Sequence, residues 1–253
     1  MDLSKKRIVF IDLDDTLIRT QSGAVLPQGS WDMVMNIDVM QQLAKLQPNG
    51  IFIVSNQGGI EKGYVHPFFF EHKMLFVISA LQEYVGQGTF VAGKYCPTID
   101  PQNQYRKPNC GMLQDMFQEF STVVNHEFTV EDCIMIGDAS GKEGDFSDSD
   151  RKCAINFGCD YMDVKEFITA DITEPMYKLI HAKNGQDSKV YGVLFKKDAK
   201  ELAEKLNTEL GEVEYIAVQE GFIPPTDNSN TETTHEEPVS QGECKPQFKV
   251  VKS

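Results

Sequence analysis

The sequence predicts an α/β fold in which a doubly wound parallel sheet is followed by a small C-terminal α+β appendage. Short apolar runs rich in β-branched residues alternate with longer segments that carry apolar residues at helical spacing. Such alternation is typical of βαβ units, and hence of a parallel sheet covered by helices. Several runs end in acidic or amide residues, and ligand sites in these sheets lie at the carboxyl ends of the strands.

Four apolar runs are predicted as buried parallel strands, because they are nearly continuous rather than alternating with polar residues. In chain order these strands are Arg7–Leu13, Ile51–Val54, Phe90–Tyr95 and Cys133–Ile136. Apolar residues at helical spacing predict a helix after each strand. The four helices are Asp38–Gln47, Pro67–Tyr84, Gly111–Phe120 and Asp150–Phe157. A helix-breaking Pro48-Asn49-Gly50 separates the first helix from the second strand.

The pattern changes after residue 170, which predicts three regions. We expect the α/β domain over residues 1–170, the appendage over 171–222 and a disordered tail over 223–253. In the appendage, two predicted strands, Lys189–Phe195 and Val213–Gln219, flank an amphipathic helix at Asp198–Leu210. The tail is rich in Pro, Thr, Asn, Ser and Glu, a composition that buries too little apolar surface to fold.

The composition is that of an ordinary soluble protein, with 41% hydrophobic and 25% charged residues. No apolar run is long enough to span a bilayer. The charged start, Met1–Arg7, lacks the apolar core of a signal peptide, so we expect a cytoplasmic protein without membrane contact. The net charge of −14 counts against broad nucleic-acid binding, since most such affinity comes from Lys and Arg at the phosphates.

The first chemical motif is Asp12-Leu13-Asp14-Asp15-Thr16, directly after a predicted strand. Three carboxylates in four residues repel one another unless a cation lies among them. Mg²⁺ suits such a position, because it prefers oxygen ligands and often combines a few carboxylates with substrate phosphate. The alternative is a solvated acidic turn.

Three further motifs follow other strands. Ser55-Asn56 could bind phosphate oxygens through its hydroxyl and backbone amides, although such a segment is often only a turn. Arg106-Lys107-Pro108 offers a cation held by the following proline, although a loop lysine is usually solvated. Gly137-Asp138 would complete a metal site. The aspartates of 145–150 could hold their loop or orient Lys107, or simply be solvated and cap a helix.

These four elements, in this order, resemble the haloacid dehalogenase (HAD) superfamily of phosphatases over roughly residues 7–165. The resemblance implies a Rossmann-like core in which Asp12 attacks phosphorus and forms an aspartyl-phosphate. It also implies that Asp14 is the general acid and then the general base. By resemblance the catalytic residues are Asp12, Asp14 and Lys107, the substrate-binding residues are Ser55, Asn56 and Lys107, and the Mg²⁺ ligands are Asp12, Asp14 and Asp138.

The spacing of the motifs bears on the substrate. There are 42 residues between Asp12 and Ser55 and 51 between Ser55 and Lys107. Family members with large caps insert them in these gaps, which the predicted helices and strands already fill here. We therefore expect a capless, open site able to accept a bulky phosphate ester.

Among capless members, polynucleotide kinase 3′-phosphatase domains are similar at several further stretches. These are Ser55-Asn56-Gln57-Gly58-Gly59-Ile60, Arg106-Lys107-Pro108 with Gly111-Met112, Gly137-Asp138-Ala139-Ser140-Gly141, and Asp145-Phe146-Ser147 leading to Asp150-Arg151 and Ala154–Gly158. The resemblance implies a polynucleotide 3′-phosphatase whose partner is a DNA or RNA 3′ end. The sequence lacks the GxxxxGK[ST] pattern of a kinase P-loop.

Three alternatives stay open. Heptose-bisphosphate and histidinol-phosphate phosphatases share the Arg-Lys-Pro and Gly-Met elements, but they usually carry a zinc loop. Here Thr98 follows Cys96-Pro97 where a histidine would be expected, so we expect no zinc. The second alternative is a non-catalytic binding module on the same fold. The third, a phosphoryl transferase or mutase, would need a cap to exclude water.

Overall fold

The protein is described by a computed structural model that covers residues 1–24, 27, 29, 31–86, 88–172, 177–181, 215–219 and 250–252. The chain divides into two compact units, one of Met1–Met176 with Lys249–Ser253 and one of Tyr177–Phe248. In the second unit, β8 (Tyr177–His181) and β9 (Tyr215–Gln219) pair as antiparallel strands. β9 lies within a predicted strand, whereas the strand predicted at Lys189–Phe195 and the helix at Asp198–Leu210 lie outside the described residues.

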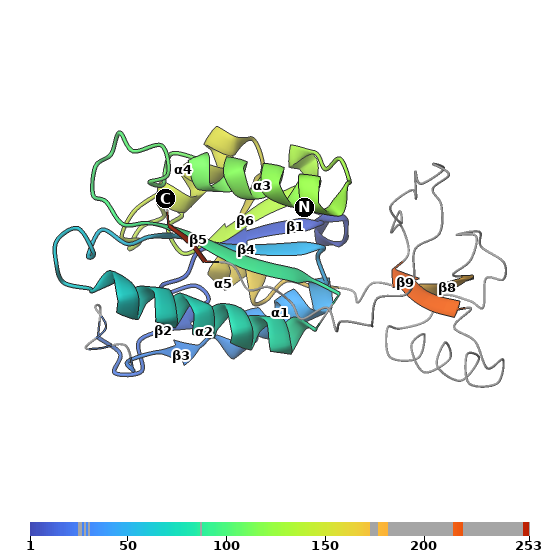
Figure 1. Ribbon diagram of the computed structural model, residues 1–253, viewed down its shortest axis with the longest axis horizontal. Helices are drawn as coiled ribbons and strands as arrows, with labels where there is room; N and C mark the ends of the chain where they lie inside the picture. Colours follow the sequence, from blue (N-terminus) through green and yellow to red (C-terminus); the bar gives the residue numbers. More distant parts are fainter. Residues whose placement is uncertain are drawn as a thin grey trace, which may run out of the picture. The chain divides into compact units, whose positions relative to one another are not determined.

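The first unit contains a parallel sheet with the strand order β10-β5-β4-β1-β6-β7 (Figure 1). Its strands are β1 (Ile8–Ile11), β4 (Gly50–Asn56), β5 (Phe90–Cys96), β6 (Cys133–Gly137), β7 (Asp160–Asp163) and β10 (Val250–Lys252). β1 is central, with Phe10 opposite Phe52 of β4 on one side and Met135 of β6 on the other. The chain winds outward from β1 in both directions, which creates a crevice at the carboxyl end of β1.

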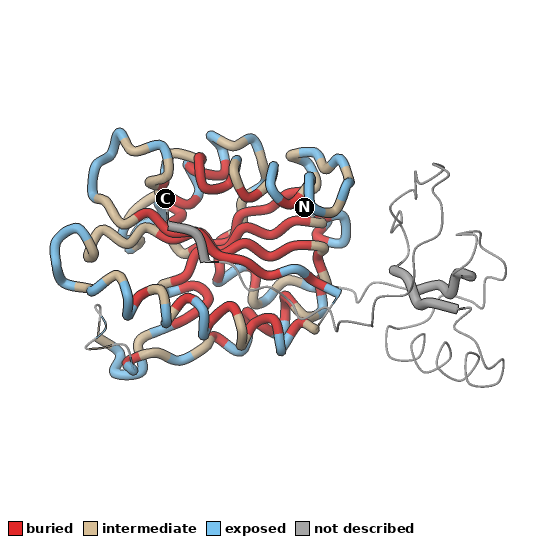
Figure 2. The backbone as a smooth tube through the Cα atoms, viewed as in Figure 1, coloured by how far each residue is buried: buried red, intermediate tan, exposed pale blue. Residues whose placement is uncertain are grey.

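Helices cover both faces of this sheet, as a doubly wound fold requires (Figure 1). One face carries α1 (Ile37–Leu46), α2 (Pro67–Val85) and α5 (Val164–Phe167), and the other carries α3 (Gly111–Val124) and α4 (Ser149–Phe157). Alternate strand residues serve the two cores: Ile11 packs toward the first group of helices and Phe10 toward the second. The strands β1, β4, β5 and β6 are therefore buried along nearly their whole length (Figure 2).

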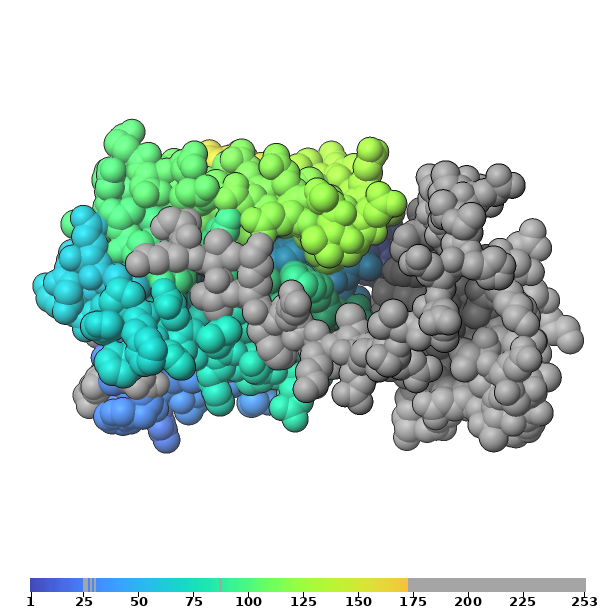
Figure 3. All heavy atoms as spheres, in the orientation of Figure 1, coloured from blue at the N-terminus to red at the C-terminus, as the bar shows by residue number. Residues whose placement is uncertain are grey.

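In the space-filling view, the side chains of α3 lie along the upper side of the first unit and those of α2 lie below them (Figure 3). No helix in the described part of the chain is long and apolar enough to cross a membrane.

The expected helices agree with α1 to α4 within a few residues at each end. The short β7 and α5 were not expected from the sequence. In β7, aspartates at both ends leave only two residues between them, and α5 has only four residues, so neither shows a recognisable apolar pattern.

A small hairpin between β1 and α1 is a second feature that the sequence did not predict. It is formed by β2 (Ile18–Arg19) and β3 (Val34–Met35), which pair antiparallel. Its base is tied by Asn36, whose Nδ2 donates to the carbonyl of Thr16 at 2.9 Å. Above it, the buried carboxylate of Asp32 accepts bonds from the backbone N and the hydroxyl of Ser22, both at 2.7 Å. Strands of two residues carry too little pattern to be recognised.

Three residues of the segment 223–253, which the sequence predicts to be disordered, form a strand. Val250–Lys252 form β10, which pairs in parallel with β5 so that Val250 lies opposite Gly93. An edge strand has a row of unpaired backbone groups, which a short β-branched segment can satisfy. The average composition of the tail hides so short a segment. The rest of the predicted tail lies outside the described residues.

Candidate active site

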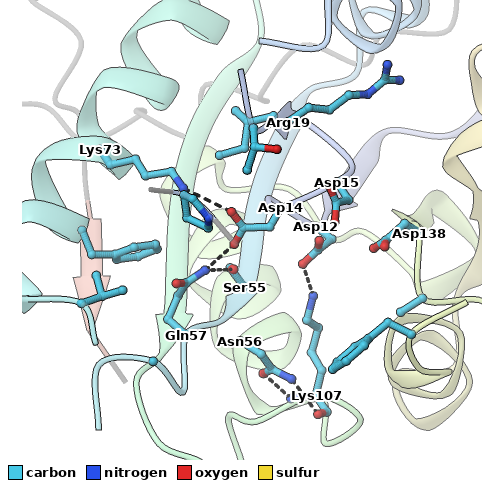
Figure 4. Close-up of a pocket in the computed structure, with 18 of the residues that line it drawn as sticks. Asp12, Asp14, Asp15, Arg19, Ser55, Asn56, Gln57, Lys73, Lys107 and Asp138 are labelled. Atoms are coloured by element: carbon cyan, nitrogen blue, oxygen red, sulfur yellow. Dashed lines mark hydrogen bonds and ion pairs between the residues drawn. The ribbon is translucent and has the colours of Figure 1, made fainter. Parts of the chain in front are cut away.

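Four strands of the sheet deliver polar side chains to the crevice beside β1. Asp12 follows β1, Ser55 and Asn56 end β4, Lys107 lies in the loop after β5, and Asp138 follows β6. The backbone N of Asp12 donates to the carbonyl of Ile136 at 2.9 Å, which extends the β1–β6 ladder into the site. All five residues line one pocket of about 1130 Å³ (Figure 4). The convergence expected from the strand ends is therefore present.

The ammonium of Lys107 lies at the bottom of this pocket, and only 3% of the residue is exposed. Nζ donates to Oδ1 of Asp12 through a short bond and to the carbonyl of Val54 at 2.9 Å, and it pairs with Oδ1 of Asp150 at 2.8 Å. Burial by itself lowers the pKa of Lys107, but the charges of Asp12 and Asp150 outweigh it and raise the pKa. Lys107 is thus a permanently charged cation beside Asp12.

Asn56 holds the loop that carries this lysine. Its Nδ2 donates to the carbonyl of Lys107 and its Oδ1 accepts from the backbone N of Lys107, both at 2.9 Å. On the far side of the loop, Nδ2 of Asn156 donates to the carbonyl of Pro108 at 2.8 Å. The sequence predicts that Asn56 binds substrate, and in the structure both ends of its amide are bonded to the backbone of Lys107. Its observed contacts are those of a positioning residue.

A cluster of three carboxylates lies beside Lys107. Oxygen atoms of Asp12, Asp138 and Asp150 all lie within 4.8 Å of one another. Burial raises the pKa of Asp12 well above its usual value, although Lys107 opposes this rise. Burial, followed by the charges of Asp150 and Asp15, raises the pKa of Asp138 to about 6. Three carboxylates around one ammonium leave a surplus of two negative charges, which fits a hard divalent cation such as Mg²⁺.

Asp150 is the member of this cluster that the sequence did not assign to the metal site. It lies in the first turn of α4 and is 1% exposed, and its Oδ2 accepts from the backbone N of Ala139 at 3.2 Å. The carboxylate packs on the Cα of Gly137, where an added Cβ would overlap with it. Gly137 is the available sequence signal, since a strand-end glycine often marks a close approach by another group.

Asp14, which the sequence also predicts as a Mg²⁺ ligand, lies outside this group of three carboxylates. Its side chain is half-exposed, and Nζ of Lys73 lies 3.2 Å from its Oδ1. Nε2 of Gln57 donates to Oδ2 of Asp14 at 2.6 Å and to Oγ of Ser55 at 2.9 Å (Figure 4). Asp14 therefore faces the pocket beside Ser55, between two side chains that the sequence did not single out. A general acid and base could act from this position.

The region that contains these residues is similar to known proteins. A family model described as "Polynucleotide kinase 3 phosphatase" matches residues 7–168. A "Bifunctional polynucleotide phosphatase/kinase" of Schizosaccharomyces pombe is 26% identical over 183 residues, which is 71% of this chain and 42% of that protein. This chain therefore spans about two-fifths of the length of that relative.

Two other matches carry the name of a sugar phosphatase. A "Probable D-glycero-D-manno-heptose-1,7-bisphosphate 7-phosphatase" of Thermoplasma volcanium is 26% identical over 145 residues, which is 56% of this chain and 91% of that protein. Among solved structures, a D,D-heptose 1,7-bisphosphate phosphatase from B. bronchiseptica, complexed with magnesium and phosphate, is 18% identical with a TM-score of 0.47. The match covers 61% of this chain and 78% of that chain.

Proposed function

The chain belongs to the polynucleotide kinase 3 phosphatase family, and from this premise we propose that it is a Mg²⁺-dependent phosphatase that removes the 3′-phosphate from DNA or RNA ends. The observation that carries the proposal is the pairing of a buried cation with a carboxylate cluster in an open pocket. Lys107 is fixed beside Asp12, and Asp138 and Asp150 complete the cluster. Phosphoryl transfer depends mainly on positioning and charge neutralisation, which this arrangement supplies.

In the proposed reaction, a carboxylate oxygen of Asp12 attacks phosphorus, and the bond from phosphorus to the ester oxygen breaks. Asp14 gives its proton to the leaving oxygen, which departs as the alcohol. Asp14 then takes a proton from a water molecule whose oxygen attacks the aspartyl-phosphate. This step releases inorganic phosphate and restores the carboxylate of Asp12 and the proton of Asp14.

Other residues of the pocket would bind and orient the phosphate. The ammonium of Lys107 and the hydroxyl of Ser55 would neutralise and hold its oxygens, while Asn56 keeps the lysine loop in place. Asp12, Asp138 and Asp150 are the side chains that would hold Mg²⁺. Bound there, the ion would shield the negative charge of the phosphate from that of the carboxylates.

The alternative substrate is a small phosphate ester, as in the heptose-bisphosphate phosphatases that the chain also matches. The pocket of about 1130 Å³ lies near the upper end of the roughly 300–1,000 Å³ usual for small-molecule sites, so it leaves room for a bulky ester such as a polynucleotide end. A non-catalytic module would not require the buried charges of the site, whose desolvation is costly.

Phosphate release from a substrate panel in the presence of Mg²⁺ tests the proposal. The panel contains a 3′-phosphorylated oligonucleotide, its 5′-phosphorylated counterpart, histidinol phosphate, a heptose bisphosphate and p-nitrophenyl phosphate. We expect a strong preference for the 3′-phosphorylated end. Preference for a small metabolite would establish the alternative substrate class, and no release from any substrate would support the non-catalytic reading.

Two controls test the mechanism independently of the substrate. Asp12→Asn should abolish turnover while leaving the circular dichroism spectrum unchanged, because the amide has the same shape but is not nucleophilic. EDTA should stop the reaction and added Mg²⁺ should restore it. Turnover by the Asn variant, or turnover unaffected by EDTA, would remove Asp12 or the metal from the proposed mechanism.

A further inference from the structure

Four large aromatic side chains surround the active-site pocket but are themselves largely exposed. They come from three segments of the chain: the hairpin of β2 and β3, the stretch from the end of β4 into α2, and the loop after β6. These side chains are Trp31 (66% exposed), Tyr64 (79%), Phe69 (57%) and Phe146 (98%). Single exposed aromatic residues are common, but a group of four around a catalytic pocket indicates a binding surface.

The charges of the same pocket are unusual for a nucleic-acid site. Seven aspartates line it against four lysines and arginines. Two of these cations are already engaged, because Lys107 is paired with Asp12 and Asp150 and Lys73 is paired with Asp14. Only Arg19 and Arg106 line the pocket without an ion pair to another described residue. Little positive charge is therefore left for backbone phosphates beyond the one that reacts.

We propose that this protein binds a polynucleotide end by stacking the last bases of the strand on the exposed aromatic side chains of Trp31, Tyr64, Phe69 and Phe146. Contacts to backbone phosphates contribute little to the affinity. This inference rests on the proposed function and specifies how the same site recognises its substrate. Stacking tolerates any sequence, because every base has a π-face. It also requires unpaired bases, so the bound end is single-stranded or frayed. Stacking would let a protein with a net charge of −14 bind a polyanion.

The first test uses the wild-type protein and two substrates. One is a 3′-phosphorylated oligonucleotide, and the other is identical except that its last nucleotide is abasic. Loss of a stacked base should raise KM by roughly 5- to 150-fold, the equivalent of about 1–3 kcal/mol per base. Equal KM values for the two substrates would overturn the inference, because the abasic strand keeps every phosphate.

The second test measures how KM for the intact oligonucleotide depends on salt, at fixed Mg²⁺. Each neutralised phosphate of a single strand contributes a slope of about −0.7 to the logarithm of affinity against that of salt. With Arg19 and Arg106 as the available cations, we expect a slope of about −1.4 or shallower. A slope of about −3 or steeper would show that phosphate neutralisation dominates, and would overturn the inference.

A matched pair of variants on α2 assigns the effect to the pocket. Phe69 and Phe76 are both 57% exposed, but only Phe69 lines the pocket. Phe69→Leu should raise the ratio of the oligonucleotide KM to the p-nitrophenyl phosphate KM by about 5-fold or more. Phe76→Leu should leave both constants unchanged. Equal effects of the two substitutions, or no effect of Phe69→Leu and Trp31→Leu, would contradict stacking in this pocket.

Failure of this inference is distinguishable from failure of the proposed function. If oligonucleotides are hydrolysed without any dependence on their bases or on the aromatic residues, only the stacking inference is wrong. If p-nitrophenyl phosphate is hydrolysed but no 3′-phosphorylated oligonucleotide is, the polynucleotide substrate is wrong and the stacking inference falls with it.

Discussion

Replacing Lys107 by methionine removes the cation from the centre of the site while keeping most of the side-chain volume. The buried carboxylates of Asp12 and Asp150 and the carbonyl of Val54 would all lose their partner. Breaking a buried ion pair from one side costs about 3–5 kcal/mol, because the remaining charge stays desolvated. At roughly 2–4 °C for each kcal/mol in a protein of this size, Tm should fall by about 6–20 °C.

The assay is chemical and thermal unfolding in EDTA, followed by circular dichroism. Lys94→Met is the matched control, because Lys94 on β5 is also 3% exposed and pairs with Asp115 of α3 at 2.6 Å, away from the active site. Asp115 is 36% exposed and can regain water, so this variant should lose only about 1.5–3 kcal/mol.

Mg²⁺ separates lost charge compensation from lost packing. A divalent cation among the unpaired carboxylates should return part of the stability of Lys107→Met and should do nothing for Lys94→Met. The reasoning would be refuted if Lys107→Met were as stable as the wild type in EDTA, or if Mg²⁺ stabilised both variants equally.

Three further predictions concern the same site. Because burial raises the pKa of Asp138 to about 6, above the unfolded value of about 3.9, the metal-free protein should lose stability as the pH rises from about 4 through about 6. Mg²⁺ should raise Tm more strongly over the same interval; a flat profile in EDTA would contradict this. Asn56→Ala breaks two hydrogen bonds to the Lys107 backbone and should lower the free energy of unfolding by about 1–3 kcal/mol. It should also lower kcat for p-nitrophenyl phosphate, and unchanged kinetics would contradict the positioning role of Asn56. Gly137→Ala would push its Cβ into the Asp150 carboxylate, so we expect the free energy of unfolding to fall by about 1–3 kcal/mol. We also expect Mg²⁺ to stabilise this variant less than the wild type. Wild-type values of both quantities would show that Asp150 can move freely.

The sequence predicted the sheet and the place of the site because both depend on local patterns. Continuous apolar runs identified β1, β4, β5 and β6. Because these strands are parallel, the polar residues at their carboxyl ends meet at the same end of the sheet. Asp12, Ser55, Lys107 and Asp138 do line one pocket there.

The contacts of individual side chains were not predictable in this way. Asp150 reaches the cluster because α4 packs on β6 over Gly137, and Asp14 turns toward Lys73 on α2. Both outcomes depend on packing between elements that are distant in the sequence. Asn56 has an amide side chain that could bind phosphate. Only the three-dimensional fold shows that both ends of this amide are hydrogen-bonded to the backbone of Lys107.

The hairpin of β2 and β3 has a consequence for how this enzyme could change its preferences. It supplies Arg19 and Trp31 to the pocket, yet its shape depends on its own bonds, from Asn36 to Thr16 and from Ser22 to Asp32. Residues 20–31 could therefore be shortened, lengthened or exchanged without disturbing the strands that hold Asp12 and Lys107. The part of the proposed binding surface that the hairpin supplies can thus be varied separately from Asp12 and Lys107, which makes this hairpin a natural place to graft a new specificity.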